Sequence, residues 1–252
     1  MRIDYIGTGA DDFLPGEVSR TGEYRRRTAA QIDGILEIDL AGTTPEERLR
    51  GVSEVIFTHS HRDHYDPDLL HRLASDRALT VYASADFAGR LAAVLPAGTR
   101  TVGLVPGDTV VTPAGYRLTA LCANHVVGDH PAEQPLHYII EHDGRRIYWG
   151  TDGAWIAPSA WYALRAAKPF DRMILDGTLG DVGGDGRIFT HNSLPMVREL
   201  AAAFRGAGLL KPDGRIVITH ISRDSQYPTA ELDALLAGDD IRVAHDDEKD
   251  EF

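Results

Sequence analysis

The sequence has only one cysteine, Cys122, in 252 residues. A single cysteine excludes an intramolecular disulfide and a cysteine-rich zinc knuckle. Cys122 ends the run 116–122, which is typical of a strand. We therefore expect a small buried side chain at this position and not a nucleophile.

Basic residues are fewer than acidic ones: the sequence has 26 Lys and Arg and 38 Asp and Glu, which gives a formal net charge of −12. A nucleic-acid carrier normally presents a basic face, so we expect no nucleic-acid partner. A long apolar run is also lacking, which predicts no membrane partner. Residues 1–5 are typical of the start of a strand and not of a signal peptide, so the expected location is cytoplasmic.

Short β-branched and aromatic runs predict about ten strands. The predicted strands are 2–6, 31–39, 54–58, 79–82, 116–122, 136–141, 145–149, 172–175, 215–219 and 241–244. Asp143-Gly144 favours a tight hairpin turn between two of them. Helix starts are indicated at Thr44-Pro45-Glu46-Glu47, at Asp66, at Asn192 or Ser193, and at Thr229.

No linker, repeat or shift in composition divides the chain, so we expect a single domain over residues 1–252. Strands interspersed with helices fit either a two-sheet sandwich with outer helices or one mixed α/β sheet. Composition alone does not separate these two architectures.

The most informative segment is His59-Ser60-His61-Arg62-Asp63-His64, which follows the strand-like run Val55-Ile56-Phe57. Imidazole nitrogen and carboxylate oxygen are the ligands that zinc and related divalent metals prefer. A histidine-rich solvated turn is the alternative, but three histidines and an aspartate at this spacing favour a metal site. The segment therefore predicts metal binding at the end of a strand.

Three further candidate ligands each follow a predicted strand, namely His125, Asp152 and His220. Alone, each would be interpreted as a turn or cap residue. Their occurrence in this order behind the six-residue motif favours a common metal centre.

Together with Gly7-Thr8-Gly9 after the first strand, this set resembles the metallo-β-lactamase superfamily over essentially the full chain. The resemblance implies an α/β fold, a four-layer αββα sandwich with the metals at one edge of the two sheets. A homodimer is compatible with the family, although no segment of the sequence specifies an interface.

The resemblance also implies a dinuclear centre with a hydroxide between the ions as the nucleophile. His59, His61 and His125 would hold the first ion, Asp63, His64 and His220 the second, and Asp152 would bridge them. Asp63 and Asp152 are thus predicted as catalytic residues as well as ligands. Two zinc ions are the first expectation, with manganese or iron as alternatives.

Departures from branches of the family narrow the expected activity. Asp152 stands where class B1 β-lactamases carry cysteine, which argues against antibiotic hydrolysis. No helical substrate domain like that of glyoxalase II follows His220, and no Gly/Pro-rich arm like that of tRNA 3′-processing members is visible.

Two features resemble the phosphoribosyl cyclic phosphodiesterases of phosphonate breakdown. One is the start of the chain, with Arg25-Arg26-Arg27-Thr28 before the second strand. The other is His191, which precedes His220 at a similar separation and is predicted to protonate a leaving alkoxide or bind a phosphate oxygen. Those enzymes also carry a structural zinc on several cysteines, which this chain cannot provide, so the resemblance is partial.

The sequence therefore predicts a dinuclear metal-dependent hydrolase of a small, phosphorylated ester, most directly a phosphodiester. One alternative is a lactonase or thioesterase on the same metal centre. Another is a non-hydrolytic protein with a redox-active iron centre or a bound metal-chelating ligand. The metal ligands do not distinguish phosphorus chemistry from carbonyl chemistry.

Several other residues carry weaker predictions. Arg25–Arg27 are expected at the surface, with capture of a phosphate as the alternative. His130 is expected near the site, His137 is expected to face outward, and Asp176 is expected to orient a ligand imidazole or cap a loop. Trp155, Trp161 and Tyr162 suit the core or a pocket wall. The tail 246–251 is expected to be a solvated acidic end.

Overall fold

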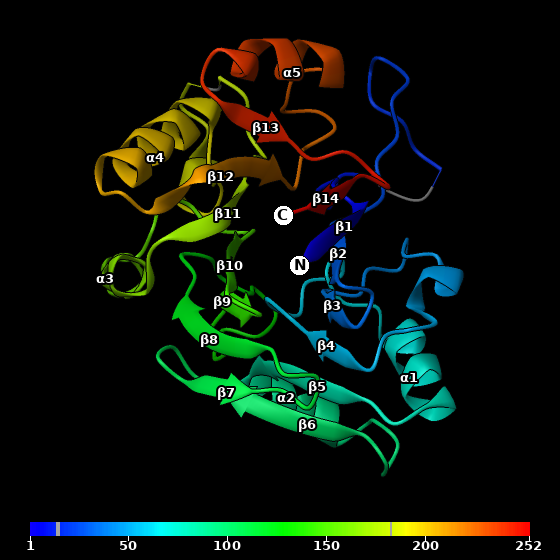
Figure 1. Cartoon of the computed structure of the whole chain (residues 1–252). Coiled ribbons are helices and arrows are strands. Elements are labelled where there is room, and N and C mark those ends of the chain that lie inside the picture. The colour runs from blue at the N-terminus through cyan, green and yellow to red at the C-terminus, as the bar shows by residue number, and fades with distance from the viewer. Residues whose placement is uncertain (14–15, 182) are drawn as a thin grey trace.

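The computed structural model describes residues 1–13, 16–181 and 183–252, whose strands form two seven-stranded sheets packed face to face (Figure 1). With helices on both outer faces, this is the four-layer αββα sandwich that we expected, and the prediction is confirmed. The first sheet runs in the order β14 (Lys249–Glu251), β1 (Arg2–Gly7), β2 (Ala29–Ile32), β3 (Leu36–Ile38), β4 (Glu54–Ile56), β5 (Thr80–Ser84) and β6 (Arg100–Leu104). The second runs in the order β13 (Ile241–Val243), β12 (Leu210–Thr219), β11 (Phe170–Asp176), β10 (Arg145–Gly150), β9 (Leu136–His142), β8 (Arg117–Cys122) and β7 (Thr109–Val111).

The helices cover the outer faces of the two sheets. Helices α1 (Pro67–Asp76) and α2 (Ala85–Ala92) pack on the first sheet. Helices α3 (Pro158–Ala167), α4 (Leu194–Gly206) and α5 (Thr229–Ala237) pack on the second. Two short 3-10 helices, η1 (Glu46–Leu49) and η2 (Gly186–Phe189), lie in connections. No helix in the described residues is long and apolar enough to cross a membrane.

The inner faces of the two sheets form one continuous hydrophobic layer. Ile3, Tyr5 and Ile38 of the first sheet belong to the same buried cluster as Tyr138 and Trp149 of the second. The rings of Tyr5 and Trp149 stack across the layer with their centroids 6.4 Å apart. Burial of each large apolar side chain stabilises the fold by about 1.5–3 kcal/mol, so this layer fixes the two sheets against each other.

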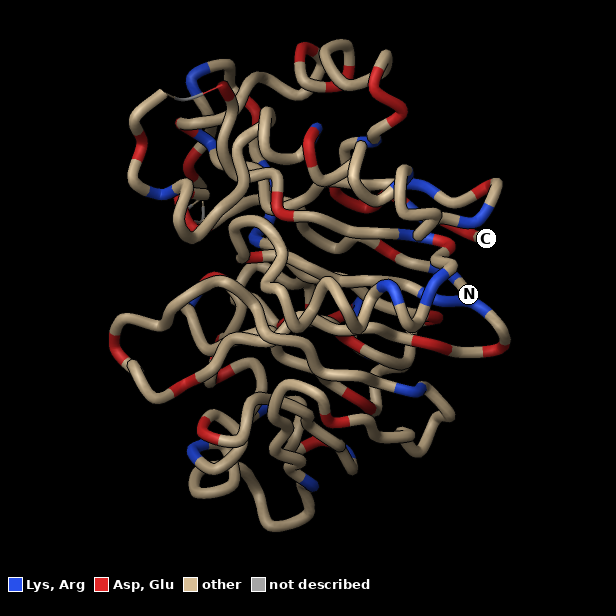
Figure 2. The backbone as a smooth tube through the Cα atoms, turned by 90° about the vertical axis from the view of Figure 1, so that its left-hand side faces the viewer, with Lys and Arg blue, Asp and Glu red and all other residues tan. Residues whose placement is uncertain are grey.

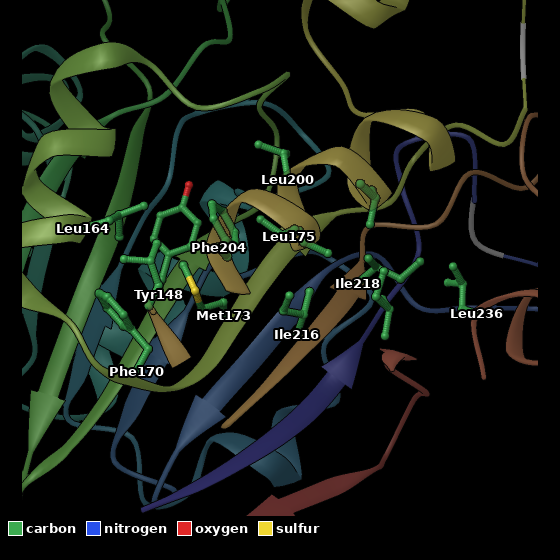
Figure 3. Packing of buried hydrophobic residues seen from close by; sticks show 14 of the residues in the cluster. Tyr148, Leu164, Phe170, Met173, Leu175, Leu200, Phe204, Ile216, Ile218 and Leu236 are labelled. Carbon is green, nitrogen blue, oxygen red and sulfur yellow. The ribbon is translucent and has the colours of Figure 1, made fainter. Parts of the chain in front are cut away.

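A second apolar layer lies between the outer face of the second sheet and its helices (Figure 3). Met173 of β11 and Ile216 of β12 pack in one cluster with Leu164 of α3 and Phe204 of α4. Both helix positions are fully buried. These contacts hold the sheet whose strand ends carry three of the seven predicted ligands, His125, Asp152 and His220.

Several local predictions are confirmed. Asp66 caps α1 by accepting a hydrogen bond from the Leu69 backbone N–H at 2.8 Å. Helix α4 begins directly after Ser193, and α5 begins at Thr229. The hairpin through Asp143 and Gly144 joins β9 to β10.

Other local predictions are wrong. The strand predicted over 31–39 is a hairpin, because Asp33 and Gly34 adopt positive φ angles and turn β2 back into β3. The helix predicted from Thr44 is only the 3-10 turn η1, which begins after Pro45. Strands β6 and β7 and helices α2 and α3 were not predicted. Their sequences are short and carry polar residues on the solvent side.

The acidic tail is not a solvated end. It contributes β14, whose Lys249 pairs with Asp4 of β1 at the edge of the first sheet. Asp250 is buried and accepts two hydrogen bonds from the Arg172 guanidinium of β11, at 2.6 and 2.8 Å. The guanidinium also lies over the Phe252 ring, 4.2 Å from its centroid. Pairing with Arg172, which is distant in the sequence, therefore allows the acidic tail to pack as strand β14.

The two ends of the chain lie side by side, and acidic and basic residues are interspersed along the backbone (Figure 2). The Phe252 N–H donates to the Met1 carbonyl oxygen at 3.2 Å. Asp246 accepts hydrogen bonds from the Thr8 hydroxyl and the Arg26 N–H. The C-terminal segment thus connects to the loop after β1.

The arginines Arg25–Arg27 do not form a solvated basic surface, and none of them lines the cavity of the metal centre described below. Arg25 and Arg27 are buried, and Arg26 pairs with Asp247 at 2.6 Å. The predicted surface role is wrong, because acceptors far away in the sequence bind these side chains inside the fold, whereas capture of a phosphate stays a prediction.

We expect Asp250→Ala to lower the free energy of unfolding by about 3–5 kcal/mol, because it leaves the Arg172 charge buried without its carboxylate. Urea unfolding measures the change. Glu251→Ala, an exposed residue of the same strand, is the matched control and should stay within about 0.5 kcal/mol of the parent. An Asp250→Ala protein as stable as that control would show that the buried pair does not hold β14.

Glu37 on β3 is fully buried, and burial raises the pKa of its carboxyl well above the ordinary value. The folded chain therefore keeps this proton at a pH at which the unfolded chain has lost it. The stability contributed by the neutral carboxyl is complete below the unfolded pKa of about 4.5 and decreases as the pH rises toward the folded pKa.

We expect Glu37→Gln to remove this component, so that stability falls less steeply between about pH 5 and pH 8 than in the parent. Urea midpoints across that range measure the slope. Glu47→Gln, at an exposed position, should keep the parental slope. An unchanged slope in Glu37→Gln would mean that the carboxyl is ionised in the folded chain.

Candidate metal centre

The predicted ligands lie at strand ends along one edge of the sandwich. The six-residue motif follows β4, and His125, Asp152 and His220 follow β8, β10 and β12. Strands β10, β11 and β12 are mutually parallel, and β8 runs the same way because β9 is antiparallel to both β8 and β10. Their carboxyl ends therefore meet at one edge, where loops from distant parts of the sequence converge.

The first group contains His59, His61, His125 and Asp152, whose ligand atoms all lie within 4.8 Å of one another. His61 Nδ1 is 2.8 Å from His59 Nε2 and 3.3 Å from His125 Nε2. Three imidazole nitrogens that converge on one point have the chemistry of a site for a divalent metal.

The second group contains Asp63, His64, Asp152 and His220, again within 4.8 Å. His220 Nε2 lies 3.2 Å from Asp63 Oδ2 and 3.3 Å from His64 Nε2. All four residues are buried. The structure thus brings together all seven predicted ligands in the two groups that we expected, although their role as metal ligands stays a prediction.

Asp152 belongs to both groups. Its Oδ2 lies 2.5 Å from His64 Nε2 and 3.3 Å from His59 Nε2, and its Oδ1 lies 3.2 Å from His220 Nε2. Oδ1 is buried and makes no hydrogen bond within the described residues, although His220 Nε2 and His191 Nδ1 each lie 3.2 Å away. A buried carboxylate oxygen without a donor is costly, and a cation between the two groups would satisfy it. The residues present therefore fit two divalent ions that share Asp152.

The backbone at two of these ligands is strained. Asp152 and His220 have φ angles of 52° and 62°, in the left-handed region that most side chains avoid. Such strain persists only where the surrounding structure holds it, and it is common at functional sites.

The protonation of the histidines differs between the two groups. Burial lowers the pKa of His59 well below its ordinary value, so this imidazole is neutral and can offer a lone pair. Burial also acts to lower the pKa of His64, but the carboxylates of Asp63 and Asp152 outweigh it and raise this pKa. The second group therefore attracts positive charge.

Asp39, at the end of β3, holds the motif from behind and was not predicted. His64 Nδ1 lies 2.8 Å from Asp39 Oδ2, and the Thr58 N–H donates to Asp39 Oδ1 at 2.8 Å. The imidazole of His64 is thereby oriented with Nε2 toward the centre. In the sequence, Asp39 could have been found only as an aspartate that directly follows β3, the strand beside β4.

Glu133 is a second residue that the sequence interpretation missed. Its buried carboxylate accepts from the Ser60 N–H at 2.8 Å and from the Ser60 hydroxyl at 2.5 Å, and it pairs with Arg90 of α2. Ser60 stands between His59 and His61, so Glu133 fixes the turn that aims both imidazoles. No local pattern marks Glu133, because its partners are distant in the sequence.

His191 lies beside the second group and contacts two carboxylates. Its Nδ1 is 3.0 Å from Asp176 Oδ2 and 3.2 Å from Asp152 Oδ1. Burial acts to lower its pKa, but Asp176 and Asp152 raise it to about 10. Asp176 also accepts from the Thr178 hydroxyl, which lies 2.8 Å from His220 Nδ1. Asp176 thus orients His191 directly and the candidate ligand His220 through Thr178, and it also accepts from the Thr178 N–H at the start of the following loop, which was the predicted alternative.

His137 does not face outward, and that prediction is wrong. It is buried, with Nε2 3.0 Å from the Thr151 carbonyl oxygen and Nδ1 2.8 Å from the Tyr148 hydroxyl. Burial lowers its pKa to about 4, so it is neutral. It supports the loop that carries Asp152 from the side of β9.

A cavity of about 730 Å³ opens over the metal-ligand candidates. His130 lines it, as the sequence interpretation expected, together with His191, Arg62 and Arg187. Trp155, Trp161 and Tyr162 do not line this cavity. Trp161 stacks on Phe204 at the edge of the core, whereas Trp155 and Tyr162 are exposed, so neither role predicted for these two holds.

Comparisons with known proteins agree with this geometry. A family model described as a beta-lactamase superfamily domain matches residues 24–221. No curated protein matches the chain. Similar solved structures include Zn²⁺-bound PqqB from Methylobacterium extorquens, with a TM-score of 0.79 and 16% identity over 100% of both chains. A diphosphatase of the PhnP family has a TM-score of 0.73 and 20% identity, over 100% of this chain and 98% of that one. The short form of human tRNase Z has a TM-score of 0.67 and 19% identity, over 100% and 99%.

We expect Glu133→Gln to weaken zinc affinity by about 10–100-fold, because the turn between His59 and His61 loses its buried carboxylate. Competition with a chromophoric chelator measures the affinity. Asp86→Asn removes the other carboxylate paired with Arg90 without touching Ser60 and should leave the affinity unchanged. Equal affinities for the two variants would refute the role of Glu133 in aiming the ligands.

Proposed function

The chain belongs to the beta-lactamase superfamily, and from that premise we propose that it is a metal-dependent hydrolase of a small phosphodiester. The observation that carries the proposal is Asp152, a buried carboxylate shared by two groups of ligands and flanked by the cationic imidazole of His191. A dinuclear metal centre and a nearby proton donor together provide the catalytic groups that hydrolysis of a phosphodiester requires.

In this proposal His59, His61 and His125 would hold one divalent ion, Asp63, His64 and His220 would hold the other, and Asp152 would belong to both sites. Ions bound there would supply water activated at neutral pH and would neutralise charge on the group under attack. Zinc suits this donor set, and manganese or iron are the alternatives.

His191 has a separate task in the proposal. Its Nδ1 is engaged by Asp176, which leaves Nε2 as the nitrogen available to a substrate in the cavity that His191 lines. The Asp176 carboxylate, which Nδ1 contacts at 3.0 Å, raises the pKa of His191 and favours a protonated ring. His191 can therefore donate from Nε2 to the leaving oxygen, or hold a non-bridging oxygen of the phosphate.

The size of the cavity agrees with a small substrate, since about 730 Å³ lies within the usual range for small-molecule sites. The similarity to a diphosphatase of the PhnP family supports phosphorus chemistry by analogy of fold. A nucleic-acid substrate does not enter the proposal, because the chain has a net charge of −12.

The proposal is tested with bis(p-nitrophenyl) phosphate, a panel of cyclic phosphodiesters and a panel of lactones, on protein of measured metal content. We expect turnover of phosphodiesters at two ions per chain and loss of that turnover in Asp63→Ala. Activity on lactones alone would replace the proposal with carbonyl chemistry. An iron-containing protein that hydrolyses no ester would refute hydrolysis altogether.

We expect His191→Asn to lower kcat for phosphodiesters by about 10²–10⁴-fold, because the proton donor is lost while the metal ligands remain. The effect should shrink for esters with better leaving groups, which need less protonation. His71→Asn, at an exposed position on α1, is the matched histidine control. A His191→Asn protein with parental kcat on all esters would exclude the proposed role.

A further inference from the structure

A second cavity, of about 250 Å³, lies next to the cavity of the metal centre. Ser222, two residues after the candidate ligand His220, lines both cavities. The second cavity is formed by the loop before β2 and by the segment between β12 and α5. It has no role in the function proposed above.

The charge of the second cavity is opposite to that of the chain. Three arginines line it, namely Arg20, Arg25 and Arg223, against one carboxylate, Glu23. The chain as a whole has a net charge of −12. The cavity of the metal centre is lined by five aspartates and only two arginines, so the two neighbouring cavities differ in the charge that they attract.

Arg25 is buried, and its recorded hydrogen-bond partners in the described part of the chain are all neutral. Its guanidinium donates to the Thr8 hydroxyl at 2.6 Å, the Ala244 carbonyl at 2.9 Å and the Thr229 hydroxyl at 2.8 Å. Two carboxylates reach Arg25 only through a hydroxyl, Asp246 through Thr8 and Glu23 through Thr229. A buried cation without a direct counter-ion is costly, and an anion in the adjoining cavity would offset that cost.

No charged group of the cavity forms a direct ion pair with Arg25 among the described residues. Arg20 is exposed and makes one hydrogen bond, to the Asp224 carbonyl oxygen. Arg223 pairs with Glu17 and Asp224, but its Nε is buried and lacks a hydrogen-bond partner among the described residues. The Glu23 carboxylate is occupied at the start of α5, where it accepts from the Thr229 N–H and hydroxyl.

The remaining lining is apolar or aromatic, with Phe13, Ile221, Tyr227 and Pro228. A small ring or short aliphatic group with a terminal anion matches this combination of apolar walls and guanidinium groups. We propose that the second cavity binds a carboxylate or phosphate at the far end of the substrate whose ester lies at the metal centre. This inference rests on the proposed function, since it assigns the substrate class as an ester that carries a second anionic group.

The test compares two diesters with the same p-nitrophenolate leaving group, phenyl p-nitrophenyl phosphate and 4-carboxyphenyl p-nitrophenyl phosphate. We expect the carboxylated diester to have a KM about tenfold lower in the parent, with similar kcat, because the added group binds away from the reacting centre. Arg20→Gln should bring the two KM values within about threefold of each other. Arg100→Gln, on the exposed edge strand β6, should keep the parental ratio.

Arg25→Gln should also remove the preference, but it breaks three internal hydrogen bonds, so Arg20→Gln is the cleaner variant. Equal KM values for the two diesters in the parent would overturn the proposal. A preference that survives in both Arg20→Gln and Arg25→Gln would also overturn it, because the anion would then be held elsewhere.

Binding of benzoate separates a failure of this inference from a failure of the proposed function. If neither diester is hydrolysed, the proposed function fails, and benzoate then tests the cavity alone. A rise in thermal midpoint with benzoate in the parent and in Arg100→Gln, but not in Arg20→Gln, would support the anion site. Equal responses in the parent, Arg20→Gln and Arg25→Gln would overturn it.

Discussion

The site depends on one carboxylate that is buried between imidazoles. Asp152 lies in both groups of candidate ligands, and one of its oxygens has no hydrogen-bond donor in the described residues. Burial of such a group is costly, so the fold must hold it in place by other means. The contact of buried His137 with its loop and the packing of β10 between β9 and β11 supply that support, and they also hold the left-handed backbone of Asp152.

A set of buried acids behind the ligands extends the same principle. Asp39 orients His64, Asp176 orients His191, and Glu133 fixes the turn of the motif. Each carboxylate holds a hydrogen-bonding group that could otherwise rotate. Each carboxylate also accepts hydrogen bonds from backbone N–H or hydroxyl groups. The imidazoles therefore have little freedom to turn away, which lowers the ordering entropy that metal binding must overcome.

The family resemblance predicted the sandwich and grouped the seven candidate ligands, because the motif and the three later ligands stand shortly after strand-like runs and carry their signal locally. Glu133, Asp39 and the buried state of His137 could not be found this way, since their partners lie in other strands and loops. The prediction of a solvated tail over 246–251 was wrong for the same reason. Its charges indicated solvent, and only the fold places Arg172 opposite Asp250.

The C-terminal segment links stability to the second cavity. Asp246 accepts from Thr8, Thr8 accepts from Arg25, and Arg25 lines that cavity. Glu23 is connected in the same way, because the Thr229 hydroxyl accepts from Arg25 and donates to Glu23, so both carboxylates reach the buried guanidinium through a hydroxyl. Because one hydroxyl separates them, the compensation is weaker than in a direct ion pair. The fold thus tolerates a buried arginine with positive charge left over, and that remaining charge is what an anionic group in the cavity would bind.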